Sequence, residues 1–101
     1  SFTGGIPVSL GKLNGLLEIS LSHNHIVGVI PSDIGRLTMV RTIDFSYNDI
    51  NGSLPESLTN LSSLVVLNLE SNNLDSEIPL DIKKLQKLST LSLRNNRFRG
   101  D

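Results

Sequence analysis

The chain has 101 residues, a hydrophobic content of 38%, no cysteine, and a formal net charge of −1. This length allows one domain at most, the near-neutral charge offers no basic surface to nucleic acid or an anionic membrane, and the lack of cysteine excludes disulfides and thiolate metal sites. No apolar run approaches the roughly 20 residues of a membrane-spanning helix, and the first residues carry no signal-peptide pattern.

One period of 24 residues runs through the whole chain. The sequence divides into a partial repeat (1–13), three full repeats (14–37, 38–61 and 62–85) and a second partial repeat (86–101), without insertions or caps. All four prolines fall at one position of the period: Pro7, Pro31, Pro55 and Pro79. A fixed period of this length predicts a repeat solenoid, in which each coil contacts only its neighbours.

The first half of each repeat predicts a short strand. Ile43 and Phe45 are two residues apart and face one side, while the polar Asp44 between them faces the other. The equivalent polar residues in the other repeats are Ser20, Asn68 and Ser92. Because so short a strand cannot bury its apolar face alone, we expect the copies to form a parallel sheet, with neighbours about 4.8 Å apart.

The second half of each repeat predicts an extended segment followed by a tight turn. Proline fixes φ and removes a hydrogen-bond donor, which favours extended backbone. Apolar residues three positions apart then suit a short 3₁₀ turn. These pairs are Leu10/Leu13, Ile34/Leu37, Leu58/Leu61 and Ile82/Leu85.

An asparagine recurs between the apolar positions of every repeat, at Asn24, Asn48, Asn72 and Asn96. A buried polar group without a partner costs roughly 1–3 kcal/mol, and an amide side chain offers two donors and an acceptor. We therefore expect a structural ladder, in which these amides bond the turn backbone of their own and adjacent coils.

The combined pattern LxxLxLxxNxLxGxIPxxLxxL resembles the plant-specific class of leucine-rich repeats. The stretch from Asp44 to Ser71 is similar to ectodomains of plant leucine-rich-repeat receptor-like kinases of the inflorescence-meristem type. The resemblance implies a horseshoe or superhelix, with parallel strands on the concave face and extended and 3₁₀ segments on the convex side. It also implies an extracellular location, at the plasma membrane or cell wall, and ligand binding on the concave or lateral face.

The sequence departs from that family in three respects. Ser76 replaces the glycine found at Gly28 and Gly52, which weakens the bend signal in that repeat. Paired-cysteine caps are missing, and so are a membrane span and a kinase domain. We therefore expect an internal fragment, whose parent protein carries a kinase or pseudokinase domain outside this chain. Without caps, apolar residues at both ends should be uncovered and favour end-to-end self-association: Phe2, Ile6 and Leu10, and Leu91, Leu93 and Phe98.

Candidate ligand-binding residues are the outward-facing ones of the strands and turns. They are His23, Asp44, Ser46, Tyr47, Asp49, Glu70, Arg94 and Arg97. A ligand would contact one strip across several coils, such as His23, Tyr47, Ser71 and Asn95. Tyrosine is enriched at binding hot spots, although Tyr47 could equally cover its neighbours' side-chain stems. Arg94 and Arg97 could bind pectin or an acidic peptide, or form a solvated face.

Other chemistry finds less support. His23 and His25 lack a third ligand for a metal site, and no cofactor motif is present. Two sequons, at Asn51 and Asn60, lie between core positions and should point outward, which predicts N-glycosylation. No catalytic triad, phosphate loop or carboxylate pair appears, so we do not expect an enzyme.

The function predicted from the sequence is extracellular recognition of a protein or peptide ligand or a co-receptor, within a receptor-like kinase ectodomain. We expect no binding of nucleic acid and no membrane contact by this fragment. The alternative is a secreted inhibitor of a cell-wall-degrading enzyme, similar to polygalacturonase inhibitors, which share the repeat. A scaffold without a ligand of its own is the third reading.

Overall fold

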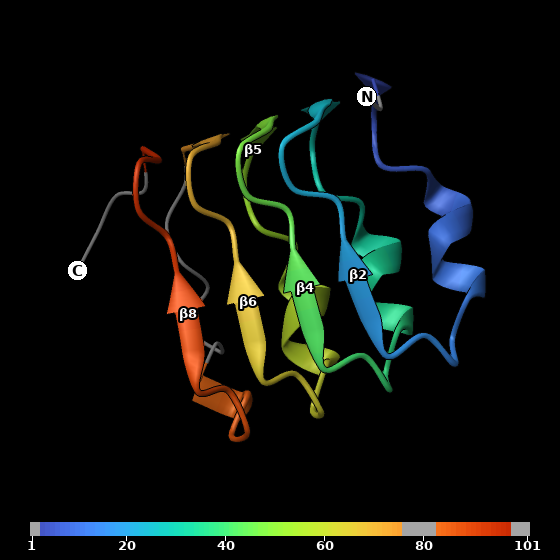
Figure 1. Ribbon diagram of the computed structural model, residues 1–101. Coiled ribbons are helices and arrows are strands. Elements are labelled where there is room, and N and C mark those ends of the chain that lie inside the picture. Colours follow the sequence, from blue (N-terminus) through green and yellow to red (C-terminus); the bar gives the residue numbers. More distant parts are fainter. Residues whose placement is uncertain (1–2, 76–82, 98–101) are drawn as a thin grey trace.

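The computed structural model describes residues 3–75 and 83–97, which form a stack of coils (Figure 1). The elements in chain order are β1 (Thr3–Gly4), η1 (Val8–Lys12), β2 (Glu18–Ser20), β3 (His25–Gly28), η2 (Ser32–Arg36), β4 (Thr42–Asp44), β5 (Asp49–Gly52), η3 (Glu56–Asn60), β6 (Val66–Asn68), β7 (Asn73–Leu74) and β8 (Thr90–Ser92). Predictions that concern Phe2, Ser76, Pro79, Ile82 and Phe98 lie outside the described residues.

The predicted parallel sheet is confirmed as the sheet β2-β4-β6-β8. Its register pairs Ile19 with Ile43, Ile43 with Leu67, and Leu67 with Leu91, so each strand lies one period from the next. Ile19, Ile43 and Leu67 are buried, and the polar residues beside them face outward. The solenoid fold is therefore that expected from the repeat.

A second parallel sheet, β1-β3-β5-β7, was not predicted. It contains the residues after each ladder asparagine, where the sequence indicated only a bend at Gly28 and Gly52. Ile26, Ile50 and Leu74 are fully buried within it, whereas His25 and Val27 on either side of Ile26 are exposed. The alternation covers too few residues to signal a strand, and pairing with the adjacent coil is what makes it one.

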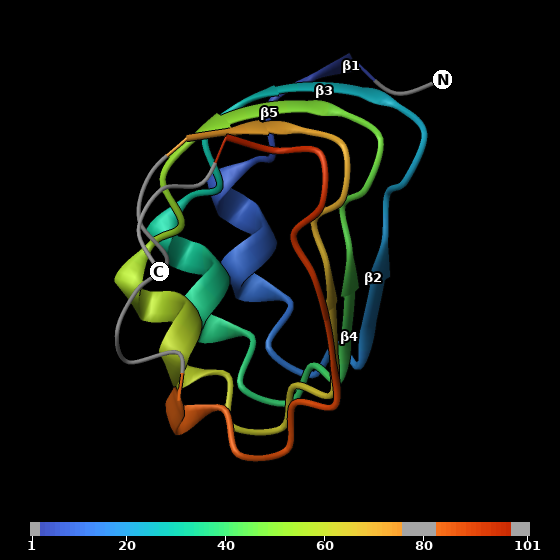
Figure 2. The same ribbon diagram turned by 90° about the vertical axis from the view of Figure 1, so that its left-hand side faces the viewer.

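The third side of the solenoid is made of stacked 3₁₀ helices (Figure 2). Pro7, Pro31 and Pro55 are extended, with φ of −72°, −71° and −69°, and each directly precedes a 3₁₀ helix. Both predictions for these repeats, extended proline and 3₁₀ turn, are confirmed. The core lies between the two sheets and these helices.

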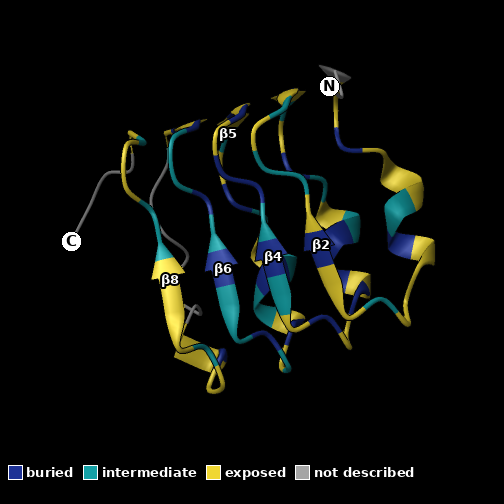
Figure 3. Cartoon of the chain, viewed as in Figure 1, coloured by how far each residue is buried: buried dark blue, intermediate teal, exposed yellow. Residues whose placement is uncertain are grey.

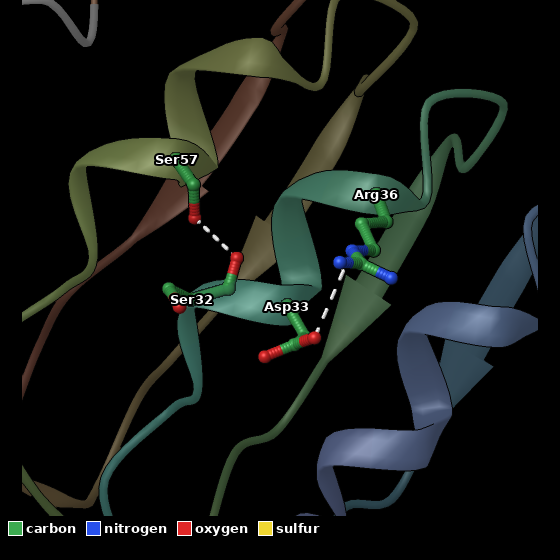
Figure 4. A network of polar contacts seen from close by, with 4 residues as sticks. All are labelled: Ser32, Asp33, Arg36 and Ser57. Carbon is green, nitrogen blue, oxygen red and sulfur yellow. Dashed lines mark hydrogen bonds and ion pairs between the residues drawn. The ribbon is translucent and has the colours of Figure 1, made fainter.

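The 3₁₀ helices approach one another closely because glycine lies at the contact. A Cβ atom on Gly35 would lie 2.6 Å from the Ser57 Cβ. The Ser57 hydroxyl donates to the Ser32 carbonyl at 2.6 Å, which ties η3 to η2 (Figure 4). The Arg36–Asp33 ion pair on the same surface, at 3.7 Å, is exposed at its arginine and contributes little stability.

The ladder asparagines connect successive turns. Asn48 is 7% exposed, and its Nδ2 donates to the carbonyls of Leu21 and Phe45, both at 3.0 Å. Its Oδ1 accepts from the Ile26 amide at 3.1 Å. Asn72 repeats this arrangement, bonding the Phe45 carbonyl and the Ile50 amide. Each amide thus satisfies backbone groups that β-pairing leaves free.

The end residues differ from expectation at Ile6, and in part at Leu10 and Leu93. Ile6 is only 7% exposed, because it joins the core cluster instead of lying uncovered. Leu10 and Leu93 are half-buried against that core. Leu91 in the last coil is 41% exposed. In the first coil, Leu13 is 53% exposed and Leu17 is 48% exposed.

Candidate functional site

Four residues in equivalent positions leave the sheet β2-β4-β6-β8 in the left-handed region of backbone space. We call them the turn column: His23, Tyr47, Ser71 and Asn95, with φ of 58°, 57°, 60° and 58°. This conformation costs a non-glycine residue roughly 1–2 kcal/mol. Backbone bonds between coils hold it, because the His23 amide donates to the Ser46 carbonyl (3.0 Å) and the Tyr47 amide to the Glu70 carbonyl (2.9 Å).

The turn column has an aromatic half and a polar half. The His23 and Tyr47 rings stack with centroids 4.4 Å apart and planes 7° from parallel. The Tyr47 hydroxyl donates to Glu70 Oε2 at 3.4 Å. Asn95 Nδ2 donates to Ser71 Oγ at 3.2 Å. The structure thus brings together three predicted site residues, His23, Tyr47 and Glu70.

An open hollow of about 330 Å³ lies beside this column, where the coils pass from the first sheet into the second. We call it the Tyr47 hollow, and its lining residues are Asn24, His25, Tyr47, Asn48, Asp49 and Ser71. Asp49 and His25 are exposed and begin β5 and β3. From the sequence, His25 is considered only beside His23 as a metal ligand and is not among the ligand-binding candidates.

The structure corrects the expectation for Ser46. This residue is 3% exposed, and its hydroxyl donates to Asp44 Oδ1 at 2.6 Å. The same oxygen accepts the Ser46 amide at 3.0 Å. Asp44 is half-buried, and its Oδ1 caps the turn. Asn68 does the same for the Glu70 amide at 3.1 Å, so this outward position of the strand has a structural role.

The remaining predicted residues lie apart from the hollow. Arg94 and Arg97 are exposed and belong to the last coil, two coils along from Tyr47. Asn51 lies in β5 and Asn60 ends η3, and both are exposed. Across residues 3–75 and 83–97, no group of three or more His, Cys, Asp or Glu side chains is placed to hold a metal ion. In the same residues no helix has the length and apolar character to cross a bilayer.

Comparison with known families identifies the repeat. The Leucine Rich Repeat family model matches residues 15–37, 39–61 and 63–85. The chain belongs to the leucine-rich-repeat family. A search of curated proteins finds no match.

Solved structures of plant receptor-kinase ectodomains superpose closely on this leucine-rich-repeat chain. The GASSHO1/SCHENGEN3 ectodomain from Arabidopsis thaliana, in complex with CASPARIAN STRIP INTEGRITY FACTOR 2, is 38% identical, with a TM-score of 0.93 over 95% of this chain and 12% of that one. The Arabidopsis HAESA ectodomain, in complex with an IDA peptide hormone, is 38% identical, with a TM-score of 0.94 over 97% and 16%.

A chain of the BIR3–SERK2 complex from Arabidopsis thaliana is 36% identical to this chain, with a TM-score of 0.92 over 97% of this chain and 53% of that one. The leucine-rich-repeat chain therefore spans about half or less of the structures that it matches. These matches confirm the resemblance to plant receptor-kinase ectodomains, whose fold is that of a binding module.

Proposed function

We propose that this chain is an extracellular recognition module within a plant receptor-like kinase ectodomain. It binds a protein or peptide ligand, or a co-receptor, through the outer face of the sheet β2-β4-β6-β8 and the turn column. The observation that carries the proposal is register: each coil presents its outward side chains directly beside those of the next coil. An extended chain lying across the coils would contact one position of the period after another.

The exposure of this face supports the proposal. Outward residues of the four strands are exposed or half-buried (Figure 3), whereas the backbone groups are engaged between strands. The face is therefore a rigid support for variable side chains, which suits recognition. The ectodomains of GASSHO1/SCHENGEN3 and HAESA, which this chain resembles, were solved in complex with CASPARIAN STRIP INTEGRITY FACTOR 2 and with an IDA peptide hormone ligand.

On this proposal the chain acts on the extracellular side of the plasma membrane or in the cell wall. The parent protein then carries a kinase or pseudokinase domain outside this chain. Asn51 and Asn60 carry N-glycans, which agrees with their exposure on β5 and at the end of η3. Secretion from plant cells should raise the mass by one glycan per site, and an unchanged mass in Asn51→Gln would argue against the first site.

The test compares peptide binding by a variant with a blocked sheet face and by a variant changed on another surface. Peptides selected on the whole chain from a display library should lose binding in the double variant Thr42→Arg/Thr90→Arg, which places two long side chains on outward strand positions. Ser9→Arg on exposed η1 is the matched control and should leave the affinity unchanged. Binding that survives the double variant would contradict the proposal.

The alternative from the sequence, inhibition of a cell-wall-degrading enzyme, stays a prediction. It rests on the repeat alone, which receptor-like kinase ectodomains and polygalacturonase inhibitors share. Slowing of a pectin hydrolase by the purified chain would favour it over a receptor segment.

We also propose that the isolated chain associates end to end. The apolar side chains that would meet are Leu13 of the first coil and Leu91 of the last, which are exposed by 53% and 41%, although the equivalent residues of inner coils are buried. Burial of this area would favour a dimer.

A further inference from the structure

In the described part of the chain, one aromatic ring stacks on Tyr47. That ring belongs to His23, at a centroid distance of 4.4 Å. The next member of the turn column is Ser71, which has no ring to stack on Tyr47. Tyr47 remains 44% exposed, and the Tyr47 hollow of about 330 Å³ lies between Tyr47 and its neighbours. A planar group entering the hollow would add a third layer to the stack.

Two carboxylates lie near this ring, and neither is paired with a lysine or arginine in the described part of the chain. Asp49 lines the hollow, and Glu70 accepts the Tyr47 hydroxyl. Among the described residues, the ion pair between Arg36 and Asp33 is the sole one. Neither Asp49 nor Glu70 therefore has an ionic partner within that part of the chain.

An aromatic face and a free carboxylate select the same kind of ligand. The ring quadrupole attracts a cation placed over its face, and a carboxylate binds a guanidinium through two parallel hydrogen bonds. Guanidinium is planar and weakly hydrated, so it can stack on tyrosine and pair at its edge at once, whereas an ammonium group is a compact, strongly hydrated charge. A neutral sugar ring could stack on Tyr47 but would gain nothing from the charge.

We propose that the Tyr47 hollow binds the guanidinium of an arginine side chain supplied by the peptide or protein partner. The guanidinium stacks on the face of Tyr47 away from His23 and pairs with Asp49. Glu70 orients the ring through the Tyr47 hydroxyl. This inference rests on the proposed recognition function and names the chemistry of one contact within it.

The chain provides its own reporter for the test. Tyr47 is the only tyrosine and there is no tryptophan, so intrinsic fluorescence reports on this ring. The probes are three acetylated and amidated tripeptides with glycine at both ends and arginine, lysine or citrulline in the middle. Citrulline keeps the shape of arginine without its charge. The arginine probe should give a saturable change that weakens at high salt, the lysine probe should bind about tenfold more weakly, and the citrulline probe should not bind.

Variants separate the charge from the ring. Asp49→Asn should weaken the arginine probe about tenfold, whereas Asn73→Ala, at the same position of the next coil, should leave it unchanged. Tyr47→Leu should weaken it similarly, measured by backbone amide chemical shifts, which also show that the variant is folded. Equal binding of the citrulline probe, or full affinity in Asp49→Asn, would overturn the proposal.

The two proposals can fail separately. If the whole chain binds a partner through the sheet face, and replacing that partner's arginines by citrulline leaves the affinity unchanged, the arginine contact is wrong and the recognition function stands. If the arginine probe binds with the stated dependence on Asp49 while no peptide or protein partner is found, the contact stands and the recognition function fails.

Discussion

Single polar residues decide how the turns of this solenoid are held. Asn48 is nearly fully buried between apolar positions, where its amide would be unfavourable alone. It is retained because it donates to carbonyls of two coils and accepts the Ile26 amide. The neighbouring residue, Tyr47, has an unfavourable φ of 57°. The hydrogen bond from its amide to the Glu70 carbonyl in the next coil offsets the free-energy cost of that conformation. The ladder asparagines thus stabilise the turns that contain the turn column.

We therefore expect Asn48→Ala to lower the free energy of unfolding by about 1–3 kcal/mol, because it leaves the buried Ile26 amide without its partner. The carbonyls of Leu21 and Phe45 keep their bonds from Asn24 and Asn72. Urea unfolding of the whole chain measures this. Asn73→Ala, at an exposed position of β7, should change the free energy by less than about 0.5 kcal/mol. Equal losses in the two variants would show that the ladder does not depend on the Asn48 amide.

Elements in this chain are stable only through their neighbours. Strands of two to four residues and 3₁₀ helices of five residues are too short to persist alone. Contacts between coils supply the missing stability, which is why close approach matters between η2 and η3. Gly35 permits that approach, since the Ser57 carbonyl would lie 2.7 Å from any Cβ placed there.

Gly35→Ala should lower the free energy of unfolding by about 1–3 kcal/mol, because the added methyl group pushes η2 away from η3. Gly15→Ala is the matched control, since a Cβ there meets nothing within 4 Å, and it should be neutral or slightly stabilising. Thermal unfolding of both variants measures the difference. A Gly35→Ala protein as stable as Gly15→Ala would mean that the stack adjusts without cost.

The whole molecule is a short one-dimensional array with sides of different character (Figure 2). Coils in the middle of such an array are covered by a neighbour above and below, while terminal coils are covered on one side. The burial of the equivalent residues Ile43 and Leu67, against 41% exposure of Leu91, follows this rule. Exposed leucines at the terminal coils therefore affect association more than folding.

We expect sedimentation velocity to show dimers or larger species at high protein concentration, and Leu13→Glu/Leu91→Glu to shift the chain toward monomer. Met39→Glu serves as control, because Met39 is 53% exposed but belongs to an inner coil. A strict monomer at every concentration would count against end-to-end association, and so would an equal effect of the Met39 substitution.

The sequence by itself determined the features that depend on spacing along the chain. The 24-residue period, the inward positions of the first sheet, the extended prolines and the 3₁₀ turns all follow from residues two, three or 24 apart. The same period aligned His23, Tyr47, Ser71 and Asn95 in one column. Membership of the leucine-rich-repeat family follows from the same positions.

Only the tertiary structure decided the features that depend on contacts between coils. The second sheet exists because short segments pair across coils, and Ser46 is buried because Asp44 bonds its hydroxyl. The stack of His23 on Tyr47 and the hollow beside it require the turn backbone to take positive φ in adjacent coils. No spacing in the sequence encodes that sign of φ at a histidine or a tyrosine, because it is set by the backbone bonds that each coil makes to the next.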